Sequence, residues 1–217
     1  MTKRKLILFG ASGGLGTGIL PLLEQDYDVT TISSKDIDIT DAAQVYNFFE
    51  QNSFDIVVNL SGCNYDSFMH KITVGNRNEV NKVIDVTING NINIVSACLP
   101  MMRKNNFGRI VLISSVLSEK IVPSTAVYSA SKSFVDTLVR VTSAENISKG
   151  ITCNSIRLGY FDAGMCHRIN PTIADGIKNT IGLKRWGSIQ ELYQTIEYLV
   201  KTEYVTGQNI TISGGLV

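Results

Sequence analysis

Short apolar runs alternate with amphipathic helical patterns along the whole chain, and this alternation restricts the possible folds more than any other feature. Repeated strand-then-helix units predict a parallel sheet, because the connecting helices cover both of its faces. We therefore expect an α/β protein with a doubly wound parallel sheet. No linker or internal repeat divides the sequence, so residues 1–217 are expected to form a single domain.

The expected strands are Lys5–Phe9, 27–32, a short one at 36–39, and the strands within FDIVVNLSG, GRIVLISS, GITCNSIRL and QNITISGG. Helices are expected from the first glycines to about Glu24, after an N-cap at Thr40 or Asp41, over 78–104, over 126–148, and after an N-cap at Ser188. In such sheets, ligands bind beyond the carboxyl ends of the strands.

Composition and charge restrict the possible partners. A net charge of +1 at pH 7 gives no general attraction to nucleic acid or to an anionic membrane surface. The apolar run near the N-terminus is too short for a signal peptide, and no stretch reaches the length of a membrane span. The four scattered cysteines and two histidines indicate neither a disulfide scaffold nor a metal site. We expect a cytoplasmic protein that binds no nucleic acid, membrane or metal.

The segment GASGGLG places three glycines, Gly10, Gly14 and Gly16, between the first strand and the first helix. Glycine allows a tight turn there, and it allows backbone N–H groups to approach a pyrophosphate at the helix N-terminus. This position in the chain indicates a dinucleotide site.

The segment ISSKD follows the second strand, where the adenosine ribose of a dinucleotide would lie. The hydroxyls of Ser33 and Ser34 and the ammonium of Lys35 suit the 2′-phosphate of NADP. Asp36 leaves NAD as the alternative, because an acidic residue in this region binds a free ribose 2′-hydroxyl. We expect NADP to be the preferred cofactor.

A serine, a tyrosine and a lysine are the candidate catalytic residues. Ser115 ends a strand, and Tyr128 begins a long helix in which Lys132 stands one turn further on. A ketone that accepts hydride needs a proton on its oxygen, and a phenol with a pKa near 10 needs a nearby positive charge to supply that proton at neutral pH. Lys132 is expected to lower the pKa of Tyr128, and Ser115 to hold the carbonyl oxygen.

In these motifs the chain resembles the short-chain dehydrogenase/reductase superfamily, and it is similar to 3-oxoacyl-carrier-protein reductases in its serine and Tyr-x-x-x-Lys motifs. GASGGLG resembles the family's cofactor turn, DITD its adenine-contacting segment, NLSG its Asn-Asn-Ala-Gly motif, RLGY its Pro-Gly turn, and YVTGQNITISGG its C-terminal sheet edge. The resemblance spans nearly the whole chain and implies a single-domain Rossmann fold.

The resemblance also implies roles for individual residues. Tyr128 would be the catalytic acid or base, Ser115 would orient the carbonyl, and Lys132 would bind the nicotinamide ribose. The remaining cofactor contacts would come from Gly10, Ser12, Gly14, Leu15 and Gly16 at the pyrophosphate, Asp38 and Ile39 at adenine, Asn59, Ser61 and Gly62 at the riboses, and Gly159 and Phe161 near the carboxamide.

The sequence departs from the family's pattern at several positions. Thr87 replaces an asparagine that holds a water beside the lysine, and Leu158, Ala163 and Ser213 replace a usual proline, threonine and aspartate. The connection between the second strand and DITD is also too short for the helix that the family places there. A short lid is expected at about 160–186, with Phe161, Met165, His167, Ile169 and Ile173 as candidates to line it.

These features predict an NAD(P)-dependent oxidoreductase that interconverts a ketone and a secondary alcohol. Acyl thioesters, keto-sugars and other polar ketones stay open as substrates. A non-catalytic dinucleotide-binding sensor or scaffold is one alternative, and a nucleotide-sugar epimerase or reductase is another. The family also implies homodimers or homotetramers formed through the two long helices, where Ile94, Val135, Leu138 and Val139 face either a partner or the core.

Overall fold

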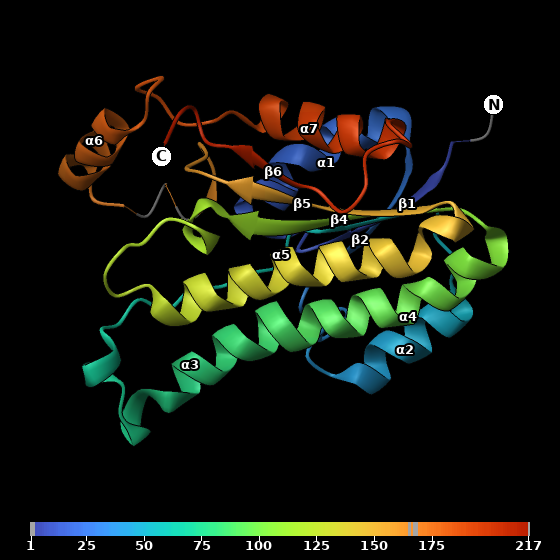
Figure 1. The fold of residues 1–217 in the computed structure, drawn as a ribbon, viewed down its shortest axis with the longest axis horizontal. Coiled ribbons are helices and arrows are strands. Elements are labelled where there is room, and N and C mark those ends of the chain that lie inside the picture. Colours follow the sequence, from blue (N-terminus) through green and yellow to red (C-terminus); the bar gives the residue numbers. More distant parts are fainter. Residues whose placement is uncertain (1–2, 165, 167–168, 217) are drawn as a thin grey trace.

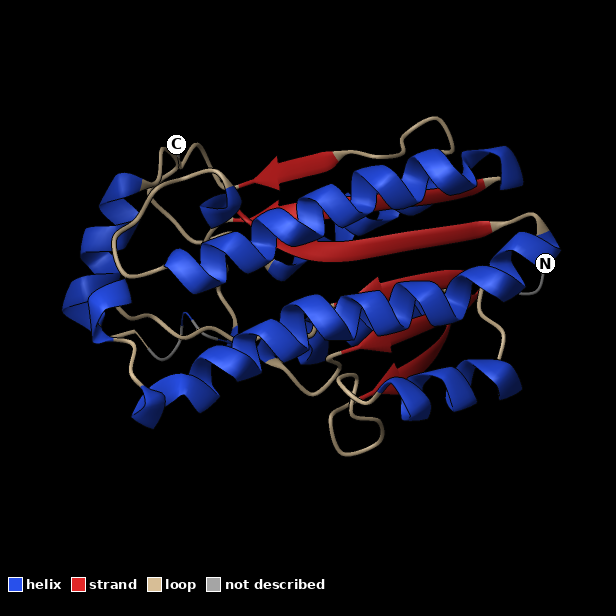
Figure 2. Cartoon of the chain, turned by 60° about the horizontal axis from the view of Figure 1, so that its bottom comes forward, coloured by secondary structure: helices blue, strands red, loops and turns tan. Residues whose placement is uncertain are grey.

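Six strands form one fully parallel sheet in the order β2-β1-β3-β4-β5-β6. The computed structural model describes residues 3–164, 166 and 169–216. The strand bounds are β1 Lys5–Phe9, β2 Asp28–Ile32, β3 Ile56–Asn59, β4 Gly108–Ser115, β5 Ile151–Leu158 and β6 Asn209–Ile212. All arrowheads in Figures 1 and 2 point the same way, so every strand delivers its carboxyl end to one edge. The expected fold class is confirmed.

Helices cover both faces of this sheet (Figure 1). One face carries α1 (Gly14–Asp26) and α7 (Ile189–Lys201), and the other carries α2 (Ala42–Gln51), α4 (Gly90–Asn105) and α5 (Ala126–Asn146). The two remaining α-helices are α3 (Arg77–Ile84), which leads into α4, and α6 (Pro171–Thr180), which lies beyond the carboxyl edge. The expected N-caps at Asp41 and Ser188 are present, because each side chain accepts a hydrogen bond from the first turn of its helix.

Strand alternation divides the core into two apolar layers. Leu6 and Leu8 pack under α1 and α7, whereas Ile7 and Phe9 pack under α2, α4 and α5. Three residues considered for a partner interface, Ile94, Val135 and Val139, are fully buried in the second layer, and Leu138 is partly buried against it. Most of the apolar face of α5 is therefore used by the sheet.

The expected short strand at 36–39 is absent, and β2 is the edge of the sheet. Ile37 and Ile39 are buried, but the segment is held by a turn, because the Asp36 amide donates to the Ser33 carbonyl at 3.0 Å. The Ile39 carbonyl accepts from Asn93 of α4 at 2.9 Å and has no partner strand. The prediction that Ile37 and Ile39 are buried is confirmed, and the prediction that they belong to a strand is wrong.

The long helix expected at 78–104 is interrupted. A π-helical turn, Asp85–Asn89, joins α3 to α4 and contacts α5. Such turns insert one residue into a helix and often occur at functional sites. Among the described residues, no helix has the length and apolar character needed to cross a membrane.

Candidate active site

The glycine turn lies against the end of β3. Gly10 has a φ of +74°, and a Cβ there would lie 2.7 Å from the Ser61 amide nitrogen. A Cβ at Gly16 would lie 2.3 Å from the Gly10 carbonyl oxygen, so both positions require glycine. Helix α1 begins directly after this turn, and its N-cap, Gly13, provides no side chain to accept from the first amides. This helix N-terminus has the form of an anion site.

The segment expected at the adenosine end forms a compact turn. The Ser33 hydroxyl and amide donate to Asp36 Oδ2 at 2.6 Å and 2.8 Å, and these hydrogen bonds lower the pKa of the Asp36 carboxyl. Ser33 is therefore engaged, whereas the side chains of Ser34 and Lys35 are exposed. A 2′-phosphate at this turn would meet the Lys35 ammonium and the Asp36 carboxylate together.

Two other predicted adenine contacts are used within the protein. The Asp38 carboxylate accepts from the Thr40 amide at 2.9 Å and from its hydroxyl at 2.8 Å. The Ile39 side chain is buried against Gly90, where a Cβ would lie 2.7 Å from it. The Ile39 side chain is therefore not available to a ligand.

The predicted ribose contacts at the end of β3 and in the following loop differ in exposure. Asn59 is 1% exposed, and its Oδ1 accepts from the Ser61 amide at 2.9 Å, so its side chain shapes the loop. Gly62 is exposed and lies beside the catalytic candidates, since a Cβ there would be 3.7 Å from Lys132 Nζ. The structure thus brings the predicted ribose-binding loop to Lys132.

Ser115, Tyr128 and Lys132 meet at the carboxyl edge. Ser115 ends β4, its Oγ accepts from the Leu117 amide at 3.1 Å, and it also hydrogen-bonds the Tyr128 side chain. Lys132 is 3% exposed, and its Nζ donates to the Ile113 carbonyl at 2.9 Å and lies 5.6 Å from the centre of the Tyr128 ring. Burial lowers the pKa of Lys132 from 10.5 to about 8.

The expected lowering of the Tyr128 pKa is not found in this structure. Burial raises the pKa of Tyr128, the hydrogen bond to Ser115 opposes this increase, and Asp66, Cys63 and Tyr160 raise the pKa further. The Lys132 ammonium, which donates to a backbone carbonyl, does not offset this increase. Desolvation of the phenol therefore outweighs the effect that the four-residue spacing suggested.

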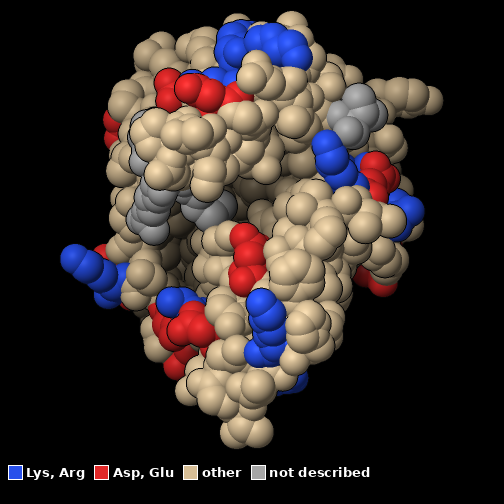
Figure 3. Space-filling view, turned by 90° about the vertical axis from the view of Figure 1, so that its left-hand side faces the viewer, with Lys and Arg blue, Asp and Glu red and all other residues tan. Residues whose placement is uncertain are grey.

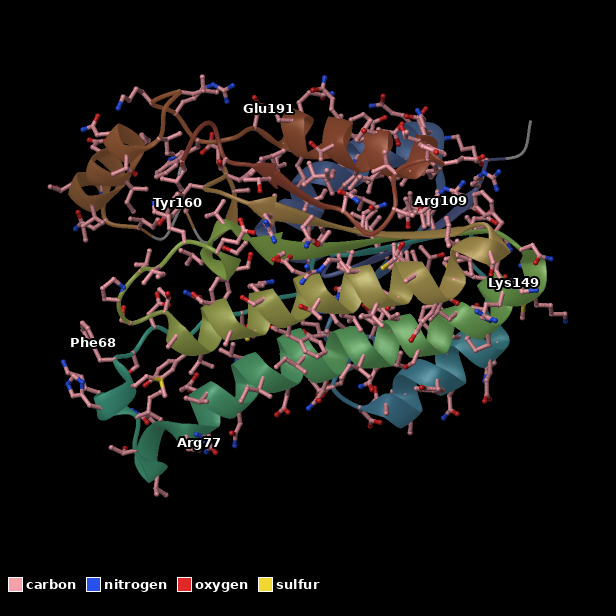
Figure 4. All side chains as sticks on the ribbon, viewed as in Figure 1. Phe68, Arg77, Arg109, Lys149, Tyr160 and Glu191 are labelled. Carbon is pink, nitrogen blue, oxygen red and sulfur yellow. The ribbon has the colours of Figure 1, made fainter. Side chains whose placement is uncertain are left out.

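Three residues near Tyr128 were missed from the sequence: Cys63, Asp66 and Tyr160. The first two lie in the loop after β3, which is held to the segment before α5 by a 2.8 Å hydrogen bond from the Ser67 amide to the Ser124 carbonyl. Figure 4 shows Tyr160 and Phe68 at the same end of the molecule, and Figure 3 shows this end hollowed, with acidic side chains at the rim. The only sequence signal for Cys63 and Asp66 is the position of their loop, directly after the end of a strand.

The segment after β5 lies over the glycine turn. A Cβ at Gly14 would be 2.3 Å from the Gly164 Cα, so these two backbones touch. Phe161 is 5% exposed and belongs to the apolar layer under α7, so its side chain is part of the core. Gly159 packs on Ser213, where a Cβ would lie 2.8 Å from the Ser213 Cα. Met165 and His167, two of the expected lid residues, lie outside the described residues.

Fold and site together define the class of protein: a dinucleotide-dependent oxidoreductase with a serine, a tyrosine and a lysine at the carboxyl edge of a doubly wound sheet. Residues 21–217 match the family described as "Enoyl-(Acyl carrier protein) reductase". The chain therefore belongs to the short-chain dehydrogenase/reductase superfamily, as its motifs predicted, and its reaction class is the NAD(P)-dependent interconversion of ketone and alcohol. This membership favours the oxidoreductase hypothesis over a non-catalytic sensor or scaffold and over a nucleotide-sugar enzyme.

Individual proteins resemble the chain along its whole length. The 3-oxoacyl-[acyl-carrier-protein] reductase FabG of Staphylococcus aureus is 28% identical, with 100% of this chain and 98% of FabG covered. Nodulation protein G of Azospirillum brasilense is 27% identical, with 100% and 99% covered. The solved structure "ElxO with NADP Bound" shares the fold with a TM-score of 0.90 at 22% identity, covering 99% of both chains. A putative gluconate dehydrogenase from Agrobacterium tumefaciens has a TM-score of 0.87 at 24% identity, covering 100% of this chain and 96% of that one.

The buried ammonium generates a prediction about stability. Lys132 has a folded-state pKa of about 8, below its ordinary 10.5, so burying its charge costs free energy at neutral pH. Between these two values the unfolded chain binds more protons, and the wild-type protein gains stability as the pH rises. We expect Lys132→Met to raise the free energy of unfolding at pH 7 by on the order of 2 kcal/mol. This advantage should shrink as the pH rises from about 8 to 10.5.

Urea unfolding at pH 7 and pH 10 measures this effect. Lys104→Met is the control, because Lys104 is exposed on α4. A Lys132→Met protein that is less stable at pH 7, or whose advantage is equal at both pH values, would contradict the prediction.

Proposed function

We propose that this protein reduces the ketone of a 3-oxoacyl thioester to a secondary alcohol, with NADPH as hydride donor. The observation that carries the proposal is the meeting of Ser115, Tyr128 and Lys132 at the carboxyl edge of the sheet, where Gly62 lies beside Lys132 Nζ and Ser61 lies against the glycine turn. Relatives of full length are named 3-oxoacyl-[acyl-carrier-protein] reductases, which supports the substrate class.

The residues around the glycine turn fit a dinucleotide. Gly10 and Gly16 carry no Cβ that would block the turn, and no side chain caps the first amides of α1, to which a pyrophosphate would bind. Gly62 lies beside Lys132 Nζ, where the hydroxyls of the nicotinamide ribose would be held. When bound there, NADPH would supply the hydride that reduces the substrate carbon.

Each catalytic residue would then have one task. As negative charge develops on the substrate oxygen, the Tyr128 hydroxyl donates its proton to that oxygen. The Ser115 hydroxyl donates a hydrogen bond to the same oxygen and holds it within reach of the phenol. The Lys132 ammonium stabilises the resulting phenolate, because the buried site weakens the screening between the two charges.

Exposed apolar side chains at this end of the molecule support a substrate with an apolar portion. They come from the segment after β3, the loop before α5 and helix α6, which all lie beyond the carboxyl edge of the sheet (Figure 1). The most exposed are Met69, Val74, Ile121 and Ile173. We assign residues 160–186 as the substrate lid, and we place the protein in the cytoplasm, consistent with free thiols at all four cysteines.

The preference for NADPH is tested at the turn after β2. Lys35→Ala removes the ammonium expected to bind the 2′-phosphate, so the Kd for NADPH should rise about tenfold while the Kd for NADH stays within about twofold. Asp36→Asn removes a negative charge at nearly unchanged shape, so NADPH should bind a few-fold more tightly. Fluorescence titration with both cofactors measures these constants. Equal weakening of NADPH and NADH by Lys35→Ala would contradict the assignment.

The catalytic role of Tyr128 is tested by Tyr128→Phe. This change removes only the hydroxyl, so reduction of acetoacetyl-coenzyme A should fall about 10²- to 10⁴-fold, the usual contribution of a general acid. Binding of NADPH should stay within about twofold of the wild type. Steady-state kinetics and titration measure the two effects. Undiminished turnover in the variant would rule out Tyr128 as the acid, and wild-type turnover of a keto-sugar but not of the thioester would refute the substrate class.

We also propose that two copies pair through the outer surfaces of α4 and α5, which lie side by side in Figures 1 and 2. Ile92 on α4 is 41% exposed and Val141 on α5 is 51% exposed, next to the partly buried Leu138. Val141→Glu should raise the dissociation constant of the dimer by at least about thirtyfold, measured by sedimentation. Tyr204→Glu, at a fully exposed loop position, is the control. An unchanged assembly in Val141→Glu would contradict this interface.

A further inference from the structure

Two buried asparagine amides connect the π-helical turn to the loop at the end of β3. Asn91 Nδ2 donates to the Thr87 carbonyl at 2.6 Å, and Asn91 Oδ1 accepts from Asn59 Nδ2 at 2.9 Å. Asn59 Oδ1 in turn accepts from the Ser61 amide at 2.9 Å. Three hydrogen bonds therefore connect Thr87 with Ser61, and all three donate in one direction, from Ser61 toward Thr87.

This chain of hydrogen bonds is isolated from water. Thr87, Asn59 and Asn91 are 0%, 1% and 2% exposed, and the Thr87 hydroxyl has no hydrogen-bond partner among the residues that the structure describes. Loss of the Asn91 amide would leave the Thr87 carbonyl without that donor and would free Asn59 Nδ2 to turn toward another acceptor. Because one amide group carries both Nδ2 and Oδ1, a turned Asn59 would also release the Ser61 amide.

The end of this chain coincides with the proposed cofactor site. The Ser61 amide contacts Gly10 of the glycine turn, and Gly62 lies beside Lys132 Nζ. The beginning of the chain lies in the π-helical turn, which packs on α5, the helix that carries Tyr128 and Lys132. The side chains of Asn91 and Asn59 thus connect the turn that packs on the catalytic helix with the loop Ser61–Gly62.

We propose that Asn91 is a positioning residue that fixes the Ser61–Gly62 backbone for the nicotinamide half of the dinucleotide. It acts through Asn59 and does not itself contact the cofactor. The inference rests on the proposed function, because it concerns the same site. It predicts that the two halves of NADPH respond differently when Asn91 is changed.

The test compares NADPH with adenosine 2′,5′-bisphosphate, which carries the adenosine half alone. In Asn91→Leu, the Kd for NADPH should rise about tenfold, as expected for the loss of about one net hydrogen bond, while the Kd for the bisphosphate changes less than about twofold. A general loosening of the fold would weaken both ligands. Asn91→Ala, which leaves room for a water, provides a second variant if the leucine protein does not fold.

Asn89→Leu is the matched control, because Asn89 lies two residues before Asn91, at the end of the π-helical turn, and its exposed side chain donates to Asp85 Oδ1 at 2.9 Å. It should bind both ligands as the wild type does. The double variant Asn59→Leu/Asn91→Leu should bind NADPH no more weakly than the weaker single variant, since both side chains serve one chain of hydrogen bonds.

The outcomes separate the two proposals. A wild-type protein that binds neither ligand would refute the proposed cofactor site. A wild-type protein that binds both, together with an Asn91→Leu variant that binds NADPH equally well or loses both ligands in parallel, would overturn the role of Asn91 alone.

Discussion

The parallel pairing of β4 with β5 is the contact on which the rest of the site depends. Both strands are eight residues long and pair over their full length, and every residue except Arg157 of β5 is buried. Parallel pairing forces the two strands to end together, so Ser115 and Leu158 stand opposite each other where the catalytic candidates begin. The lid segment follows Leu158, and a 3₁₀ turn that Ser115 caps follows β4, so both begin at the carboxyl edge. Placement of the site is thus a consequence of backbone hydrogen bonding.

Burial determines the electrostatics of the catalytic candidates more than their mutual distance does. Desolvation is the largest influence on both Tyr128 and Lys132, and it moves each group toward its neutral form. The Ser115 hydroxyl opposes this tendency at Tyr128, and Asp136 opposes it at Lys132, whose ammonium also donates to the Ile113 carbonyl of β4. The pair is therefore held between two fixed dipoles of β4, and the strand affects the chemistry as well as the geometry.

Much of the fold and of the candidate site could be predicted from local patterns in the sequence. Glycines at Gly10 and Gly16 reflect a steric requirement that acts over a few residues, and the four-residue spacing of Tyr128 and Lys132 fixes their common helix face. The pKa of Tyr128 was not predictable, because burial and the approach of Asp66 depend on segments far apart in the chain. The segment at 36–39 misled for a similar reason, since burial under α4 and burial in a sheet give the same alternation. Asn91 could be found only from its partners, because nothing in its local sequence separates it from Asn89 or Asn93.

The position of β2 at the edge of the sheet has a consequence for the behaviour of the molecule in concentrated solution. An edge strand presents unpaired N–H and C=O groups, which another chain can use to extend the sheet. Here the edge is only five residues long, and Asp28, Thr30 and Thr31 along it are polar and exposed. A short edge with a charge at its start is a poor template for such extension. No further strand covers β2 within the described residues. Its short length and its three exposed polar side chains instead disfavour pairing with a strand of another molecule.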